Sequence, residues 1–328
     1  MPPFIRLIAT TSLALALSAQ AMADAGRPKI GLVLGGGGAR GAAHIGVLEV
    51  LEELKIPVDC VAGTSMGALI AGAYASGLTP AMMRTEMAEA DWDTMFSDIP
   101  DFSDVNYRYK ETLRRFIPGS ELGVSSDGVR FPSGVIDGVK IKLFFNQLVG
   151  ANRGERRIEK LPLPLSLIAT DIGNGERVVI REGSLTTAMR ASMSVPGLLA
   201  PITRDGRKLV DGGLVDNVPI GEARERCNAD IVIAVNVGSP LLPAESVGSL
   251  LTISAQMVNI LTEQNVARSL ASLKPTDIYI QPDLGTITAG DFGRHAEAAD
   301  RGRAAADKVR ERLARLGTSP ITGGSVRR

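Results

Sequence analysis

The sequence predicts an α/β fold whose mostly parallel sheet is covered by helices on both faces. Short apolar runs end in glycine or polar residues, and helical patterns follow several of them. Strands that alternate with helices are typical of parallel sheets, because parallel neighbours need a long crossover. The chain has 328 residues, of which 45% are hydrophobic. That is enough for one large domain, or at most two, with an ample core.

The first elements follow this alternation closely. The run Lys29–Leu34 ends in glycines and predicts a buried strand. Apolar residues at helical spacing predict a helix over Ala42–Leu54 that ends near Pro57. Val58–Ala62 predicts the second strand, and Ala68–Tyr74 predicts the helix that follows it.

The second half of the chain repeats the pattern less regularly. We expect strands at Leu163–Thr170, Arg177–Ile180, Leu209–Asp211, Ile231–Val237 and Asp277–Gln281. We expect helices at Gly221–Asn228, Ser246–Arg268 and Gly293–Leu316.

Residues 92–154 interrupt the alternation with scattered aromatic residues and glycines, and we expect a cap-like insertion that is partly helical near Val139–Val149. A mobile cap would form the substrate entrance, whereas a solvated insertion of no functional weight also fits. One segment combines amphipathic rings with positive charge, which favours an anionic lipid surface. Its members are Tyr107, Arg108, Tyr109, Lys110, Arg114 and Arg115.

The two ends of the chain do not belong to the predicted domain, which spans residues 24–317. Arg6, an apolar stretch to Ala21 and the small residues Ala21 and Ala23 are typical of a cleaved export signal over residues 1–23. An uncleaved anchor is the alternative. We therefore expect an exported protein, periplasmic or secreted, with a disordered tail at 318–328.

Charge and cysteine usage limit the function classes. Basic and acidic residues balance at 36 each, which gives no indication of nucleic-acid binding. Two cysteines and two histidines without ligand spacing predict no metal site. Export permits a disulfide, but Cys60 lies in a strand and Cys227 on a polar helix, so we expect two buried free thiols.

Gly63-Thr64-Ser65-Met66-Gly67 lies between a predicted strand and a predicted helix. This is the sequence form of a nucleophile elbow, in which small residues at Gly63 and Gly67 let the chain reverse around a strained serine. An ordinary glycine-rich turn is the alternative.

The glycine loop Gly35–Gly41 lies between the first strand and the first helix. The spacing of Gly36, Gly38 and Gly41 satisfies the dinucleotide-binding pattern, although the second strand ends in serine rather than an acidic residue. Alternatively, the N–H groups of Gly37 and Gly38 form an oxyanion hole over Ser65. A purely structural turn remains a third interpretation.

A serine nucleophile needs a base, and neither histidine follows a late strand. His44 lies on the first helix and His295 starts the last one. Asp211 stands at a strand terminus before Gly212 and Gly213, so it is the stronger candidate base. A hairpin turn at Asp211 is the alternative.

Taken in order, these motifs resemble those of the patatin-like phospholipases, most closely the bacterial branch. The resemblance also includes 42–48 and 190–197, and it covers roughly Ile30 to Val237. It implies a three-layer α/β/α fold, a catalytic Ser65–Asp211 dyad without histidine, and oxyanion donors at Gly37 and Gly38. Arg40 would brace the loop or meet an anionic head group. The implied substrates are phospholipids or lysophospholipids, with no cofactor.

The sequence thus favours a serine lipid acyl hydrolase with peripheral membrane contact. A dinucleotide-dependent oxidoreductase and a catalytically silent lipid-binding module are the rival hypotheses.

Overall fold

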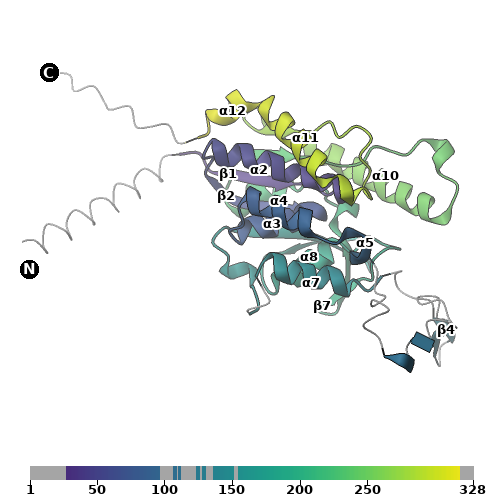
Figure 1. Cartoon of the computed structure of the whole chain (residues 1–328). Helices are drawn as coiled ribbons and strands as arrows, with labels where there is room; N and C mark the ends of the chain where they lie inside the picture. The colour runs from purple at the N-terminus through teal and green to yellow at the C-terminus, as the bar shows by residue number, and fades with distance from the viewer. Residues whose placement is uncertain are drawn as a thin grey trace, which may run out of the picture.

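A computed structural model describes residues 27–96, 106–108, 110–111, 123–125, 128–130, 136–150 and 154–317 (Figure 1). Its strands are β1 (Ile30–Leu34), β2 (Val58–Thr64), β3 (Gly123–Ser125), β4 (Gly128–Arg130), β5 (Leu165–Asp171), β6 (Arg177–Ile180), β7 (Ile202–Arg204), β8 (Arg207–Asp211), β9 (Ile231–Val235) and β10 (Ile278–Ile280). Its α-helices are α2 (Ala43–Glu53), α3 (Met66–Ala75), α4 (Pro80–Glu89), α5 (Trp92–Met95), α7 (Val139–Leu148), α8 (Leu185–Ser192), α9 (Ile220–Arg226), α10 (Leu250–Leu270), α11 (His295–Asp307) and α12 (Arg310–Ala314). Short 3-10 turns are η1 (Gly38–Ala42), η3 (Ile158–Lys160), η4 (Gly212–Leu214), η5 (Ala244–Ser246) and η6 (Phe292–Arg294).

The main sheet has the strand order β10-β9-β1-β2-β5-β8-β7, and β6 also pairs with β5. The five strands from β10 to β5 are parallel, whereas β6 and β8 run antiparallel to β5 and β7 runs antiparallel to β8. The carboxyl ends of β1 and β2 therefore meet at one edge. The prediction of a mostly parallel sheet is confirmed.

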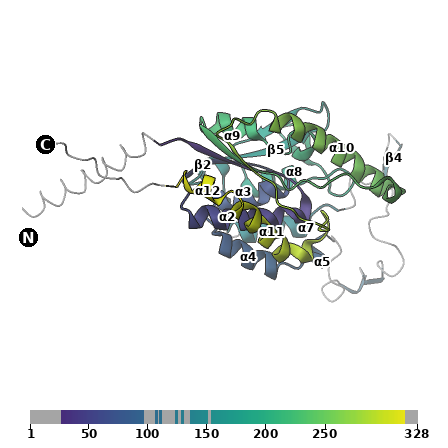
Figure 2. The ribbon, with the colours of Figure 1, turned by 90° about the horizontal axis from the view of Figure 1, so that it is seen from above.

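Helices cover both faces of this sheet, which gives three layers (Figure 2). In β1, Leu32 and Leu34 face the core shared with α2, α3, α8 and α11, whereas Val33 faces the core shared with α9. This alternation follows from the period of two in a strand, and continuous apolar runs are needed because both faces are buried. The predicted α/β/α architecture is correct.

The predicted elements differ from the observed ones mainly at the C-terminus and in the antiparallel part. The expected closing helix is two helices, α11 and α12, separated at Lys308 and Val309. Helices α4 and α8 and the short strand β7 carry no counterpart in the sequence prediction. In contrast, β6 has the predicted bounds.

Several sequence predictions fall outside the described residues: the export signal, the tail at 318–328, and much of the cap-like insertion. The described part of that insertion includes the expected helix, observed as α7. At its start, Trp92 stacks on Phe292, and Phe96 packs on the same ring at 4.7 Å between centroids. Among the helices described, none combines the length and the apolar content that crossing a bilayer requires.

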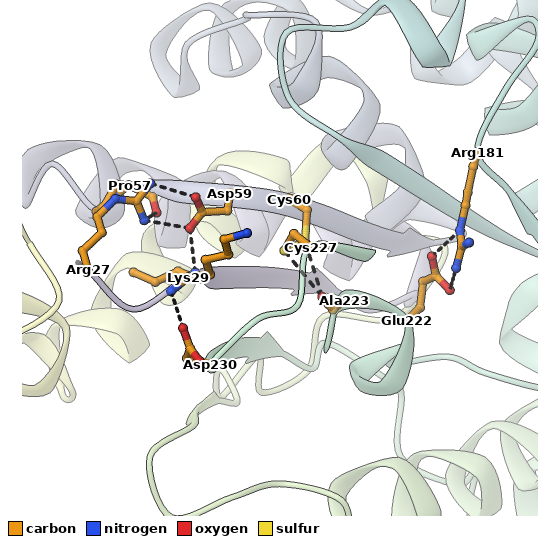
Figure 3. The surroundings of a disulfide bond; sticks show 11 residues. Arg27, Lys29, Pro57, Asp59, Cys60, Arg181, Glu222, Ala223, Cys227 and Asp230 are labelled. Atoms are coloured by element: carbon orange, nitrogen blue, oxygen red, sulfur yellow. Dashed lines mark hydrogen bonds and ion pairs between the residues drawn. A yellow bond between two sulfur atoms is a disulfide. The ribbon is translucent and has the colours of Figure 1, made fainter. Parts of the chain in front are cut away.

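The expectation of two free thiols is wrong, because Cys60 and Cys227 form a disulfide (Figure 3). Cys60 is buried in β2 and shares the sheet face of Ala62, which packs against α9. Cys227 follows α9 directly, so the same face brings both sulfur atoms together. The bond links residues 167 positions apart. It connects β2, the strand that leads to Ser65, to the end of helix α9.

We expect the double replacement Cys60→Ser with Cys227→Ser to lower the free energy of unfolding by about 2–5 kcal/mol, because the unfolded chain loses a long-range cross-link. Urea denaturation with and without reductant measures the effect. Reductant should destabilise the wild-type protein by a similar amount and leave the double variant unchanged. Two titratable thiols in the unreduced, denatured wild-type protein would show that the bond does not form.

Candidate functional site

Ser65 lies at the turn between β2 and α3, with φ 54° and ψ −125°. A non-glycine residue at positive φ is strained, and such strain is typical of functional turns. The flanking glycines permit the turn: a Cβ on Gly67 would lie 2.0 Å from the Leu34 carbonyl oxygen, and one on Gly63 would lie 2.6 Å from the Gly67 carbonyl oxygen. The expected elbow geometry is therefore present.

The Ser65 hydroxyl donates to Asp211, with 2.6 Å between Oγ and Oδ2. The other carboxylate oxygen of Asp211 accepts the N–H of Gly213 at 2.7 Å. Both side chains are buried: Ser65 is 8% exposed and Asp211 is 4% exposed. Burial raises the pKa of Asp211 to about 6, against the opposing effect of these two hydrogen bonds. The carboxylate is thus ionised at neutral pH and is a stronger base than a solvated aspartate.

Asp211 ends β8, which runs antiparallel to β5. The register pairs Asp211 with Ala169, next to Ile168, and Ile168 pairs with Thr64 at the end of β2. The hydroxyl of Thr170 donates to the Asp211 carbonyl oxygen at 2.8 Å and fixes this end of the strand. Gly212 is required by close packing, because a Cβ there would lie 2.3 Å from the Ile168 carbonyl oxygen. The Asp-Gly-Gly sequence therefore turns beside the serine rather than at a hairpin.

The glycine loop follows β1 and lies against the elbow. A Cβ on Gly36 would approach the Ser65 Cβ to 2.8 Å, and Gly38 has a φ of +58°, which favours glycine. Gly37 and Gly38 line the same cavity as Ser65. In the described part of the chain, their N–H groups donate to no protein acceptor, whereas those of Gly36 and Ala39 do. Two backbone donors are thus available beside the serine.

Arg40 and Gly41 anchor this loop. The Arg40 guanidinium donates to the carbonyl oxygens of Val237, Ile287 and Gly238 at 2.9, 2.7 and 3.1 Å. It is buried, and these three contacts fit the bracing role expected for it. Gly41 makes room for Met66, whose Cγ would lie 2.2 Å from an added Cβ.

Neither histidine lines the cavity that contains Ser65. His44 is fully buried, and its Nε2 lies 2.7 Å from the Gly35 carbonyl oxygen. Because a carbonyl only accepts, Nε2 carries the proton, and burial lowers the pKa of His44 to about 4. His295 contacts the Phe292 carbonyl oxygen at the start of α11. Each histidine ring thus contacts a backbone carbonyl oxygen, and neither contacts Asp211.

A cavity of about 440 Å³ opens over Ser65. Its polar floor consists of the glycine loop, Ser65 and Asp211, and its walls are mainly apolar. The apolar wall residues are Met66, Phe96, Met193, Val195, Leu198, Leu199, Ala255, Val258, Ala289 and Phe292. An apolar chamber with a few convergent polar groups suits a ligand with a hydrocarbon chain and one polar reacting group.

Two asparagines that the sequence analysis missed join the three motifs. Asn217 exchanges hydrogen bonds with Gly36, from Gly36 N–H to Oδ1 and from Nδ2 to the Gly36 carbonyl oxygen, both at 3.2 Å. Asn265 on α10 accepts the Asn217 N–H at 2.8 Å and donates to the Gly213 carbonyl oxygen at 2.8 Å. Isolated asparagines carry no periodic signal, so only the fold reveals this connection.

Ser192 lies in the 190–197 segment that the family resemblance includes, but the sequence analysis gave it no role, and the structure places it against the elbow. Its hydroxyl accepts the Ser65 N–H at 2.9 Å and donates to the Ile168 carbonyl oxygen at 2.5 Å. It is fully buried at the end of α8. The bond satisfies the N–H of a strained residue and thereby positions the Ser65 backbone.

We expect Ser192→Ala to lower kcat by about tenfold to a hundredfold, because the buried Ser65 N–H loses an acceptor worth about 1–3 kcal/mol. Hydrolysis of a soluble ester measures kcat, and urea denaturation measures stability. Ser166→Ala is the matched control, since the buried Ser166 hydroxyl has no hydrogen-bond partner in the described part of the chain. Equal kcat values for the two variants would contradict the positioning role.

The sequence profile described as patatin-like phospholipase matches residues 32–224. A patatin-like phospholipase domain-containing protein of Caenorhabditis elegans is 40% identical over 213 residues, covering 64% of this chain and 14% of that protein. An uncharacterized NTE family protein of Mycobacterium tuberculosis is 34% identical over 218 residues, covering 66% of this chain and 51% of that protein. A lysophospholipase of Candida glabrata is 30% identical over 321 residues, covering 90% of this chain and 17% of that protein. The chain thus spans about half of the mycobacterial relative and less than a fifth of the other two.

Proposed function

The chain belongs to the patatin-like phospholipase family, and from this premise we propose that it is a serine lipid acyl hydrolase of the phospholipase A or lysophospholipase type. The observation that carries the proposal is the 2.6 Å hydrogen bond from Ser65 to Asp211 at the floor of an apolar cavity. The substrate is a phospholipid or lysophospholipid, whose acyl chain suits the cavity walls.

In the proposed acylation, Ser65 Oγ attacks the ester carbonyl carbon while its proton passes to Asp211 Oδ2. The carbonyl oxygen becomes an oxyanion, which accepts hydrogen bonds from the N–H groups of Gly37 and Gly38. The tetrahedral intermediate then expels the alcohol oxygen, which takes the proton from Asp211. The products of this half-reaction are the free alcohol and an acyl ester on Ser65.

Deacylation reverses the roles with water as the nucleophile. Asp211 accepts a proton from water, whose oxygen attacks the acyl carbon of the ester on Ser65. The intermediate collapses, Ser65 Oγ leaves and recovers the proton, and the fatty acid departs. Since the pKa of Asp211 is raised to about 6, the same group accepts and returns a proton near neutral pH.

The geometry gives less support to the rival hypotheses. In the glycine loop, Gly36 is packed against Ser65 and Asn217, at positions that leave no room for a Cβ. The second strand leads into Ser65 rather than into the acidic residue that a dinucleotide ribose prefers. A lipid-binding module without catalytic activity does not require a strained serine that is hydrogen-bonded to a buried carboxylate.

A fluorophosphonate probe with mass spectrometry tests the proposal. The acyl hydrolase should be labelled at Ser65 and should release fatty acid from mixed phospholipid vesicles. Absence of both labelling and release would refute the hydrolase and leave the lipid-binding module. Labelling at another serine would refute the assignment of Ser65.

Three further expectations belong to this proposal. The protein is exported, and the disulfide supports this because such bonds persist in oxidising compartments. The insertion over 92–154 forms a cap that admits substrate, which the packing of Trp92 and Phe96 beside the cavity supports. The third expectation is membership of the bacterial branch of the family, and the relatives include a mycobacterial protein at 34% identity beside a nematode protein at 40%.

A further inference from the structure

Helix α10 has apolar residues on two opposite sides. Ala255, Val258, Asn259 and Thr262 line the cavity over Ser65. Ile253, Met257, Ile260 and Leu261 are exposed by 45, 60, 39 and 45%. Two residues along a helix turn the side chain by about 200°, so Ile253 and Ala255 point to opposite sides. An apolar side of a helix is normally buried, whereas this side of α10 lacks a cover within the described part of the chain.

The inner side of α10 is tied to the catalytic elements. The hydroxyl of Thr262 and the amide of Asn265 both donate to the Gly213 carbonyl oxygen, at 3.0 and 2.8 Å. Gly213 in turn donates to Asp211. The exposed apolar side therefore belongs to a helix whose other side holds the turn after Asp211 and walls the proposed acyl cavity.

The outer surface of α10 carries no charge over its first half. No Asp, Glu, Lys or Arg occurs from Ser246 to Thr262. The preceding loop adds Leu241, which is 44% exposed, and Gln256 holds this loop through two hydrogen bonds to the backbone of Leu242. Figures 1 and 2 place α10 at the outside of the molecule, on the face of the sheet opposite to α2 and α11. An uncharged apolar strip of this kind matches a lipid surface that has no net charge.

The size of the strip argues against a second copy of the chain as its partner. Together, the exposed fractions of its four residues on α10 equal about two fully exposed side chains. That corresponds to an apolar surface on the order of 300 Å². A stable protein interface buries roughly 800 Å² on each partner. A lipid surface has no such threshold, because binding grows with each apolar side chain that leaves water.

We propose that the outer side of α10, formed by Ile253, Met257, Ile260 and Leu261, docks on the surface of a phospholipid bilayer with neutral, zwitterionic head groups. The choice of lipid as the partner rests on the proposed function, because docking there places the cavity wall next to the layer that contains the acyl chains. This contact is independent of salt, unlike the electrostatic contact expected of the basic segment around Arg108.

Sedimentation with vesicles of diether phosphatidylcholine tests the proposal, because ether lipids resist an ester hydrolase and binding is measured without turnover. We expect the full chain to bind these vesicles equally at low salt and high salt. The variant Met257→Gln with Leu261→Gln should bind about tenfold or more weakly, since two apolar side chains lose their burial. Its hydrolysis of a soluble short-chain ester should equal that of the wild-type protein, because neither residue lines the cavity.

Met82→Gln with Leu143→Gln is the matched control, since these residues are 51 and 61% exposed on α4 and α7. It should bind vesicles like the wild-type protein. The proposal is overturned if the wild-type protein does not bind neutral vesicles, if both double variants bind alike, or if binding falls with salt. A concentration-dependent dimer that Met257→Gln with Leu261→Gln abolishes would identify a second copy instead. Vesicle binding without fluorophosphonate labelling would refute the hydrolase and leave the docking surface intact.

Discussion

Replacing Ser65 with alanine is expected to lower kcat/KM for a short-chain nitrophenyl ester by about 10⁴-fold or more, as in other enzymes that lose a serine nucleophile. The hydroxyl is the sole nucleophile proposed, and among the described residues that line the cavity no other oxygen nucleophile is paired with a carboxylate or histidine. The fold should persist, because alanine keeps the Cβ that packs beside Gly36. Steady-state hydrolysis and the thermal midpoint measure the two outcomes.

Ser76→Ala provides the control for this variant. Ser76 caps the other end of α3, where its hydroxyl donates to the Gly72 carbonyl oxygen at 2.7 Å. The Ser76→Ala protein should keep wild-type activity and should still be labelled by the fluorophosphonate. If Ser65→Ala retains more than a few per cent of wild-type turnover, the nucleophile lies elsewhere in the chain.

The sequence predicts the positions of Ser65, Asp211 and the glycine loop because each has a strong local requirement. Gly63 and Gly67 are needed wherever a strand reverses sharply into a helix, and that requirement is visible in five residues. Parallel strands also bring their carboxyl ends to one edge, so motifs at the ends of different strands are expected to meet. This expectation holds for the glycine loop after β1 and for Ser65 after β2, which are parallel. Asp211 instead ends an antiparallel strand, and it lies 2.6 Å from Ser65 because it pairs with Ala169 near the carboxyl end of β5.

The sequence does not predict the residues that hold these motifs together. Ser192, Asn217 and Asn265 are single polar residues whose partners lie 127, 181 and 52 positions away. Local patterns contain no information about contacts at such separations. The sequence does not predict the disulfide for the same reason, because its formation depends on which sheet face Cys60 occupies and where α9 ends. The direction of β8 was likewise undetermined, since a short apolar run fits either orientation.

Asp211→Asn is expected to lower kcat by about 10³–10⁴-fold, because an amide does not accept the serine proton. In the wild-type protein, kcat/KM for an uncharged ester should fall as pH drops through about 6, where Asp211 becomes protonated. The pH profile and the variant thus test the same group by separate routes. A wild-type profile without a limb near pH 6, together with an active Asp211→Asn protein, would require another base.

The same substitution is expected to stabilise the fold at pH 7.5. Burial raises the pKa of Asp211 from its ordinary value of 3.8 to about 6 in the folded protein, so its ionised form costs on the order of 3 kcal/mol of folding free energy at pH 7.5. Asparagine removes that cost and still accepts the Gly213 N–H. At about pH 2.5, well below both pKa values, the carboxyl is protonated in both states, so the stabilisation should disappear. Urea denaturation at the two pH values measures it, with the exposed substitution Glu225→Gln on α9 as control. An Asp211→Asn protein less stable than wild type at pH 7.5 would show that the buried charge is compensated in the folded state.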